Sequence, residues 1–213
     1  MRDIERFISG FRQFQKDYFG ARTAHYERLK DGQNPRTMLI GCSDSRVDPT
    51  LLTNSQPGDL FTVRNIANLV PPCERDLGKH GVSAALEYAV CELEVEDIVV
   101  MGHSNCGGIQ SLMRGDCLPD SDSFIKRWMS IAAPALKQVR EELKGKDEQL
   151  LRRALEQAAI LLSIENLHSF PFIEKRMKEG KLSLHGWYFD MNDGHLLEYD
   201  YEQRLFVNSQ RGK

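Results

Sequence analysis

The stretch GVSAALEYAVCELEVEDIVVMGHSNCGG, residues 81–108, contains the pattern that decides the fold. Its first part predicts a helix with one buried face, because apolar residues recur there at helical spacing. These residues are Val82, Ala85, Leu86, Ala89, Val90 and Leu93. Residues 97–103, DIVVMGH, then predict a buried strand that ends in Gly-His. A second helix is expected to begin directly afterwards, with Ser104 or Asn105 as its N-cap.

The same alternation continues on both sides of this stretch. Short strands are predicted at residues 37–40 and 60–63, and long helices at 121–142 and 147–168. Residues 182–200, LSLHGWYFDMNDGHLLEYD, indicate two strands joined by an Asn-Asp-Gly turn, which is typical of a β-hairpin. Strands that alternate with helices favour an α/β fold. We therefore expect a mostly parallel central β-sheet flanked by helices, with a C-terminal β-hairpin.

The first thirty residues predict a helical arm. Its apolar residues recur at helical spacing, and they are Ile4, Phe7, Ile8, Phe11 and Phe14. Two interpretations are open: the helix docks on the core of its own chain, or it lies across a second subunit. No shift in composition marks a domain boundary, so residues 1–213 are expected to form a single domain.

Composition and charge exclude several classes of protein. A formal net charge of −3 over 213 residues argues against general nucleic-acid binding, which needs a cationic face. We find no signal-peptide pattern and no apolar run long enough for a membrane span, and we therefore expect a cytoplasmic protein. Its five cysteines are odd in number and widely spaced, which argues against a disulfide framework. Cys91 lies in an apolar helical stretch and is expected in the core.

Potential metal ligands follow two of the predicted strands. Cys42 comes directly after the strand at 37–40, and His103 and Cys106 come after the strand at 97–103. Ligands of open parallel sheets gather at the carboxyl ends of the strands, so these residues can meet if the two strands are neighbours. Two thiolates and one imidazole suit zinc, and three protein ligands with an open fourth position are typical of a catalytic zinc site.

Asp44 and Arg46 decide what kind of metal site this is. Asp44 lies two residues after the first cysteine and can reach the open position, while Arg46 can hold its carboxylate in a bidentate pair. The alternative is a turn aspartate or a surface ion pair with little energetic value. A nucleophilic Cys42 with an anion-binding Arg46, as in thiol phosphatases, is a weaker hypothesis, because only three residues separate the two.

These motifs resemble those of the β-class carbonic anhydrases. The resemblance rests on CSDSR at 42–46, GHSNCGG at 102–108 and QPGDLFTVRNIANLVPP at 56–72. It implies a zinc enzyme that reversibly hydrates carbon dioxide to bicarbonate and a proton. By this resemblance Cys42, His103 and Cys106 bind one Zn²⁺ per chain. Asp44, paired to Arg46, orients the zinc-bound hydroxide, or ligates zinc itself as an alternative fourth ligand in a closed state.

The resemblance also implies an assembly and a subgroup. β-class enzymes form homodimers, which can pair into homotetramers, with the sites at the dimer interface and the N-terminal arm across the partner. The sequence is most similar to the plant-like subgroup. Its substrate-binding positions correspond here to Gln33, Phe61, Ile66, Tyr88 and Gly107. The other subgroup binds regulatory bicarbonate with a Trp, an Arg and a Tyr. The corresponding residues here are Leu39, Arg64 and Phe189, so this chain has the same residue type only at the arginine.

Two other functions compete with carbon dioxide hydration. The zinc could serve only the fold of a noncatalytic interaction module, or the same site could hydrolyse carbon disulfide or carbonyl sulfide. For a hydratase we expect activity that rises into alkaline pH, because two thiolates neutralise the charge of zinc and weaken its effect on water. His25, His80 and His195 are candidates for the proton shuttle because they titrate near neutrality, whereas His168 and His185 are expected to be structural.

Overall fold

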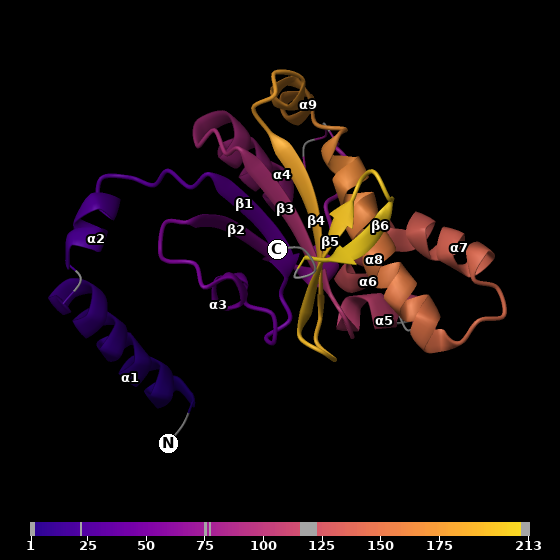
Figure 1. Cartoon of the computed structure of the whole chain (residues 1–213), viewed down its shortest axis with the longest axis horizontal. Coiled ribbons are helices and arrows are strands. Elements are labelled where there is room, and N and C mark those ends of the chain that lie inside the picture. Colours follow the sequence, from indigo (N-terminus) through magenta and orange to yellow (C-terminus); the bar gives the residue numbers. More distant parts are fainter. Residues whose placement is uncertain (1–2, 22, 75, 77, 116–122, 210–213) are drawn as a thin grey trace. The chain divides into compact units, whose positions relative to one another are not determined.

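The computed structural model describes residues 3–21, 23–74, 76, 78–115 and 123–209. The chain divides into two compact units, Met1–Asn34 and Pro35–Lys213 (Figure 1). Cys117 lies outside the described residues. A single domain over residues 1–213 stays a prediction.

The N-terminal unit is helical, as the sequence predicts. It contains α1 (Asp3–Lys16), a π-helical turn (Asp17–Ala21) and α2 (Thr23–Leu29). Aromatic contacts hold these helices together, since the ring of Phe14 lies 4.8 Å from that of Tyr18 and 5.7 Å from that of Tyr26. α1 buries none of its side chains, and Phe7 and Phe11 of its apolar stripe are 59% and 64% exposed. Whether the arm crosses a second subunit stays a prediction.

The larger unit is built on a six-stranded sheet with the order β2-β1-β3-β4-β5-β6. The strands are β1 (Thr37–Cys42), β2 (Leu60–Asn65), β3 (Asp97–His103), β4 (Ser183–Asp190), β5 (His195–Asp200) and β6 (Leu205–Asn208). The first four strands in this order are parallel, and β5 and β6 are antiparallel. The predicted fold class and C-terminal hairpin are therefore confirmed, and β6 extends that hairpin by one strand.

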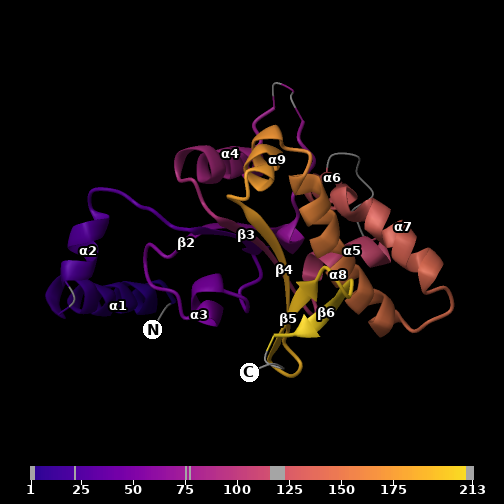
Figure 2. The same ribbon diagram turned by 45° about the horizontal axis from the view of Figure 1, so that its top comes forward.

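Helices cover the sheet and form the core with it. They are α3 (Pro49–Thr53), α4 (Gly81–Glu87), α5 (Gly107–Arg114), α6 (Phe124–Met129), α7 (Ala133–Glu142), α8 (Glu148–Leu167) and α9 (Pro171–Lys178). Leu86 of α4, Ile160 of α8 and Ile173 of α9 are fully buried in one cluster with strand residues, and Figure 2 shows these three helices on the same side of the sheet. No helix in the described part of the chain is long and apolar enough to span a membrane.

Two local predictions are wrong, each for a structural reason. The N-cap of α5 is Cys106, because Asn105 has a left-handed φ of 58° and the Ser104 hydroxyl accepts a hydrogen bond from Met191 N instead. Cys91 is exposed, because the helix widens into a π-helical turn at Tyr88–Glu92 that buries only Ala89 and Val90.

Candidate metal centre

Two neighbouring parallel strands bring the predicted ligands together. β1 and β3 pair directly, with Gly41 opposite Met101, so Cys42 and His103 leave the same edge of the sheet. Cys106 follows one turn later as the N-cap of α5. The left-handed backbone of Asn105 makes this return possible, since asparagine tolerates that conformation better than most residues. The two strands that precede the potential ligands are therefore neighbours, as the predicted metal site requires.

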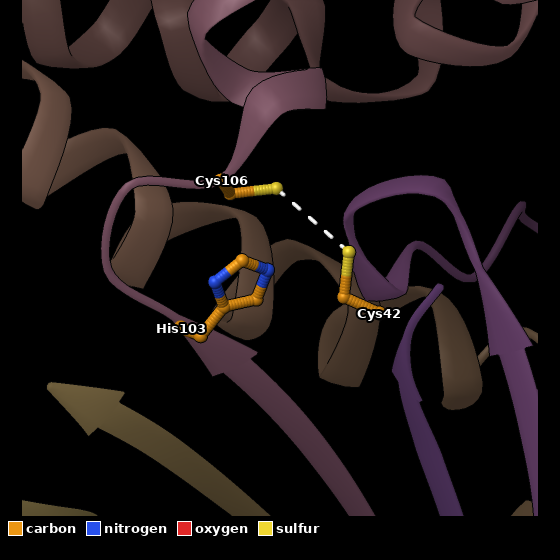
Figure 3. Close-up of side chains that lie close together, drawn as sticks. All are labelled: Cys42, His103 and Cys106. Atoms are coloured by element: carbon orange, nitrogen blue, oxygen red, sulfur yellow. Dashed lines mark hydrogen bonds between the residues drawn. The ribbon is translucent and has the colours of Figure 1, made fainter. Parts of the chain in front are cut away.

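The three side chains converge on one buried point (Figure 3). Their potential ligand atoms all lie within 4.8 Å of one another, and the side chains of Cys42, His103 and Cys106 are at most 4% exposed. The two sulfur atoms are 4.0 Å apart. With a Zn–S bond of about 2.3 Å, tetrahedral coordination separates two thiolates by about 3.8 Å. The spacing of the sulfur atoms therefore fits zinc.

His103 has a nitrogen that only a further ligand would satisfy. Its Nδ1 lies 2.9 Å from the carbonyl oxygen of Ser104. Because a carbonyl only accepts, Nδ1 carries the proton and Nε2 keeps its lone pair. Nε2 is buried without a hydrogen-bond partner and faces the sulfur atoms. A buried, unpartnered acceptor beside two thiols is the donor set that a zinc ion completes.

The contact between the two sulfur atoms shifts the pKa values of the two thiols in opposite directions. A hydrogen bond from Cys106 lowers the pKa of the Cys42 thiol to about 4, although burial opposes this, and His103 adds to the lowering. The same sulfur–sulfur contact raises the pKa of Cys106. A thiolate is the form of cysteine that binds metal, and the lowered pKa favours this form at Cys42. The second thiol loses its proton when a cation binds both.

Asp44 and Arg46 form a fixed pair beside this group. Asp44 Oδ1 accepts from Arg46 N at 3.0 Å and from Arg46 Nε at 2.9 Å, and Asp44 Oδ2 accepts from Arg46 Nη2 at 2.7 Å. These bonds hold the pKa of the Asp44 carboxyl well below its usual range. Arg46 also donates to the carbonyl of Asn105 at 3.1 Å. The pair therefore ties the loop after β1 to the loop after β3, which a simple surface ion pair would not do.

The carboxylate is aimed at the metal-binding group without joining it. Asp44 Oδ2 lies 3.9 Å from His103 Nε2, while both carboxylate oxygens are engaged by Arg46. In this arrangement Asp44 lies beside the three potential ligands, and a metal bound by them would have its carboxylate as a neighbour. The closed state, in which Asp44 would be a ligand, stays a prediction.

Two further residues support the site in roles that were not predicted from the sequence. Arg64 of β2 donates to the carbonyls of Cys42 and Asp44, at 2.9 Å and 2.7 Å, and to the Asp48 carboxylate. It therefore clamps the loop that carries the first ligand. The family resemblance relates Arg64 only to a position that binds regulatory bicarbonate, so this supporting role was not predicted.

Glu156 of α8 supports Cys106 through a hydrogen bond to its backbone. It is 3% exposed and accepts from the backbone N–H of Cys106 at 3.2 Å and from the Tyr188 hydroxyl at 2.8 Å. Burial raises the pKa of its carboxyl. A single glutamate inside the apolar run LEQAAILL of α8 could have indicated a buried polar role.

The predicted substrate-binding residues fall into three groups. Ile66 lies directly after Asn65, which pairs with Cys42, and Gly107 directly follows Cys106 as the first residue of α5. Both are therefore beside the metal-binding group. Phe61 precedes Asn65 by four strand positions, about 13 Å, and its ring contacts Tyr88 at 5.8 Å between centroids. Gln33 belongs to the N-terminal unit, and its role stays a prediction.

Comparison with known proteins identifies the family. A sequence model of the family described as carbonic anhydrase matches residues 37–196, a region that includes all three potential ligands. The chain belongs to the carbonic anhydrase family.

Individual relatives agree with this assignment. A carbonic anhydrase of Synechocystis sp. is 36% identical over 207 residues, which cover 97% of this chain and 75% of that protein. The solved structure of the β-carbonic anhydrase CcaA is 36% identical with a TM-score of 0.91, covering 98% of this chain and 92% of that one. One of two tetrameric β-carbonic anhydrases from Sordaria macrospora is 31% identical with a TM-score of 0.77, covering 92% and 97%.

The family establishes what the sequence predicted about activity. The chain is a β-class carbonic anhydrase in sequence and fold, an enzyme that reversibly hydrates carbon dioxide and uses zinc. The group formed by Cys42, His103 and Cys106 can bind that metal.

Proposed function

We propose that Cys42, His103 and Cys106 bind the catalytic zinc and that Asp44, fixed by Arg46, orients the attacking oxygen. The observation that carries this proposal is the buried, unpartnered Nε2 of His103, which faces two thiols. A carboxylate fixed by three hydrogen bonds lies 3.9 Å from that nitrogen. A purely structural zinc site would be closed by a fourth protein ligand and would need neither Asp44 nor Arg46.

Each side chain has a defined part in the reaction. Zinc supplies the Lewis acidity that lowers the pKa of a water molecule towards neutrality. Asp44 accepts a hydrogen bond from the attacking oxygen and so turns a lone pair of that oxygen towards the carbon atom of carbon dioxide. Ile66, 40% exposed beside the site, gives the apolar substrate a dry contact. Gly107 opens α5, where backbone N–H groups without an intrahelical acceptor can donate to bicarbonate oxygens.

The rest of the substrate pocket is proposed to come from a second subunit. Phe61 and Tyr88 contact each other, and Tyr88 is 47% exposed, but Phe61 is about four strand positions from the cysteine edge of its own sheet. In a homodimer, Phe61 and Tyr88 of each chain could instead line the site of the partner chain, which would account for their distance from the cysteines of their own chain. Gln33 is proposed to contribute a donor from the same partner, as in the plant-like subgroup. The tetrameric relatives support further pairing of dimers.

Subunit mixing tests this shared site. Asp44→Asn and Phe61→Ala chains are each expected to form weakly active dimers. Mixed dimers contain one site with both wild-type residues if Phe61 acts across the interface. Random mixing should then restore about a quarter of the wild-type activity. Activity that stays at the average of the two parents would place Phe61 in its own chain's site or outside any site, and gel filtration of the mixture would verify that dimers are present.

The pH dependence of the wild type tests the mechanism. We expect stopped-flow carbon dioxide hydration to rise from about pH 6.5 to 9, because two thiolate ligands weaken the effect of zinc on water compared with three neutral histidines. The ionisation of Asp44 does not contribute to the change of rate over this pH range. Its pKa is depressed, and a carboxylate with a depressed pKa stays ionised at all pH values above that pKa, including this whole range.

Two results would contradict this proposal. Zinc near one per chain without hydration at any pH would leave a noncatalytic zinc-stabilised module, and turnover of carbon disulfide or carbonyl sulfide in its place would indicate the hydrolase. A rate that is highest at pH 6.5 and falls towards pH 9 would contradict the proposed ionisation.

A further inference from the structure

A cavity of about 470 Å³ lies beside the loop that follows the first potential metal ligand. Its lining includes Ser43 and Asn65, of which Ser43 lies between Cys42 and Asp44 in the sequence and Asn65 pairs with Cys42. Lys79, His80 and the first residues of α4 line it as well. The cavity has room for on the order of ten water molecules. It therefore brings residues next to the metal-binding group and the segment that precedes α4 to the same cavity.

His80 is held in the wall of this cavity by a carboxylate. Its Nε2 lies 2.6 Å from Asp76 Oδ1, which also accepts from Gly78 N at 2.6 Å. Because the carboxylate only accepts, His80 Nε2 carries a proton and Nδ1 of the neutral ring keeps a lone pair. The side chain is 29% exposed, so it has access to both the cavity and solvent.

The backbone at Gly78 lies close to the His80 imidazole and leaves no room for a side chain at position 78. A Cβ atom at Gly78 would lie only 2.7 Å from His80 Nε2 and 2.8 Å from Asp76 Oδ1, so a side chain at position 78 would displace the ring. The side chain of His80 does not cap α4, although the residue occupies the N-cap position. The geometry therefore serves the contact between His80 and Asp76 rather than the helix end.

Hydration of carbon dioxide requires a group of this kind. Each turnover of carbon dioxide and water yields bicarbonate and one proton, which must reach bulk buffer. Asp44 is a poor acceptor, since Arg46 holds its pKa low. His185 and His168 are paired with Asp97 and Glu174 and do not line the cavity. Among the histidines whose side chains the structure describes, His80 alone lines it.

We propose that His80 is the proton shuttle of this enzyme and that Asp76 is its positioning residue. The proton released by the attacking water passes along water molecules in the cavity to Nδ1 of the neutral imidazole. The imidazolium then gives one proton to a buffer base, which restores the neutral ring; no electrons are transferred. This inference rests on the proposed hydratase function.

The charged groups around His80 tune its proton affinity. The hydrogen bond to Asp76 raises the pKa of the imidazole, and the charge of Glu74 adds to this. Among the described residues that line the cavity, Lys79 carries the other charge beside His80. Ser43, Asn65 and Trp128, which face it from other elements, carry no charge. Asp76 therefore helps the ring take a proton from the cavity.

His80→Ala is the variant that tests the shuttle. In dilute buffer we expect kcat for hydration to fall about tenfold or more, with kcat/KM unchanged, because the proton leaves after carbon dioxide has been converted. Added imidazole should restore kcat by accepting the proton directly. His195→Ala is the matched control: His195 lies on β5 beside Asp193 and outside the cavity, so its loss should change neither constant.

Asp76→Asn gives a second readout that a structural role would not produce. The asparagine can still accept from Nε2, but it lacks the charge that raises the pKa of His80. When proton transfer limits turnover, kcat rises with pH as His80 loses its proton. Because the variant lowers the pKa of His80, this rise should occur at lower pH than in the wild type. Unchanged kcat in His80→Ala, or an equal fall of kcat and kcat/KM without imidazole rescue, would overturn the shuttle. A wild type without hydration activity would instead overturn the proposed function.

Discussion

Cys42→Ala is expected to lose zinc and to reduce carbon dioxide hydration to the uncatalysed background, a loss of several orders of magnitude. Cys42 is one of only two thiols in the buried group, and it is the one whose pKa is lowered to about 4. Without it, His103 and Cys106 offer two ligands, too few for the coordination of a catalytic zinc ion. Metal analysis after gel filtration and stopped-flow hydration measure the two effects.

The control is a cysteine that takes no part in the site. Cys91 is exposed on the π-helical turn after α4, and Cys91→Ala makes the same chemical change. We expect this variant to retain about one zinc per chain and wild-type activity. Far-UV circular dichroism establishes whether each variant is folded. A folded Cys42→Ala enzyme that keeps both zinc and activity would exclude Cys42 as a ligand.

The sequence was most informative where one local pattern determines the structure. Residues 97–103 were predicted as a strand and form β3 with those bounds, because an apolar run between polar segments has few alternatives. The meeting of Cys42 with His103 needed one assumption beyond local pattern, that the two strands are neighbours, and the observed sheet satisfies it. Given that assumption, the residue types of the ligands and the positions of the strand ends were sufficient to predict the metal-binding group.

The missed features depend on contacts between segments that are far apart in the chain. Ser104 was a reasonable N-cap by residue type, but its hydroxyl accepts from Met191 N, 87 positions away. Cys91 follows the apolar periodicity until the π-helical turn changes the phase of the helix. Glu156 and Arg64 support the site through the backbone of Cys106 and Cys42. Such contacts exist only once the sheet and α8 have assembled.

Asp44→Asn is expected to lower hydration about 10²- to 10³-fold, the usual effect of removing one group that acts on the developing charge, while zinc remains bound. Asparagine has nearly the same shape and can still accept from Arg46 through its carbonyl oxygen. It places an amide where Asp44 Oδ2 lies, 3.9 Å from His103 Nε2, and an amide nitrogen donates where the attacking oxygen needs an acceptor. Stopped-flow kinetics of a metal-analysed variant measures this loss.

A matched carboxylate distinguishes this effect from the loss of any ion pair. Glu96 pairs with Arg36 near the other end of β1, with both side chains largely exposed. Glu96→Gln should leave kcat and kcat/KM unchanged. An Asp44→Asn enzyme with zinc and near wild-type kcat would exclude the orienting role of the carboxylate.

The dependence of Arg46 on Asp44 completes this prediction. Arg46 contacts both carboxylate oxygens of Asp44 and the Asn105 carbonyl. If Arg46 acts only by fixing Asp44, Arg46→Ala lowers the rate less than Asp44→Asn does, and the double variant is no slower than Asp44→Asn alone. If the two losses multiply, Arg46 contributes independently through the loop that carries Cys106. The bonds from Arg46 to both oxygens of Asp44, against one to Asn105, favour the first result, because residues that act as a unit are strongly non-additive.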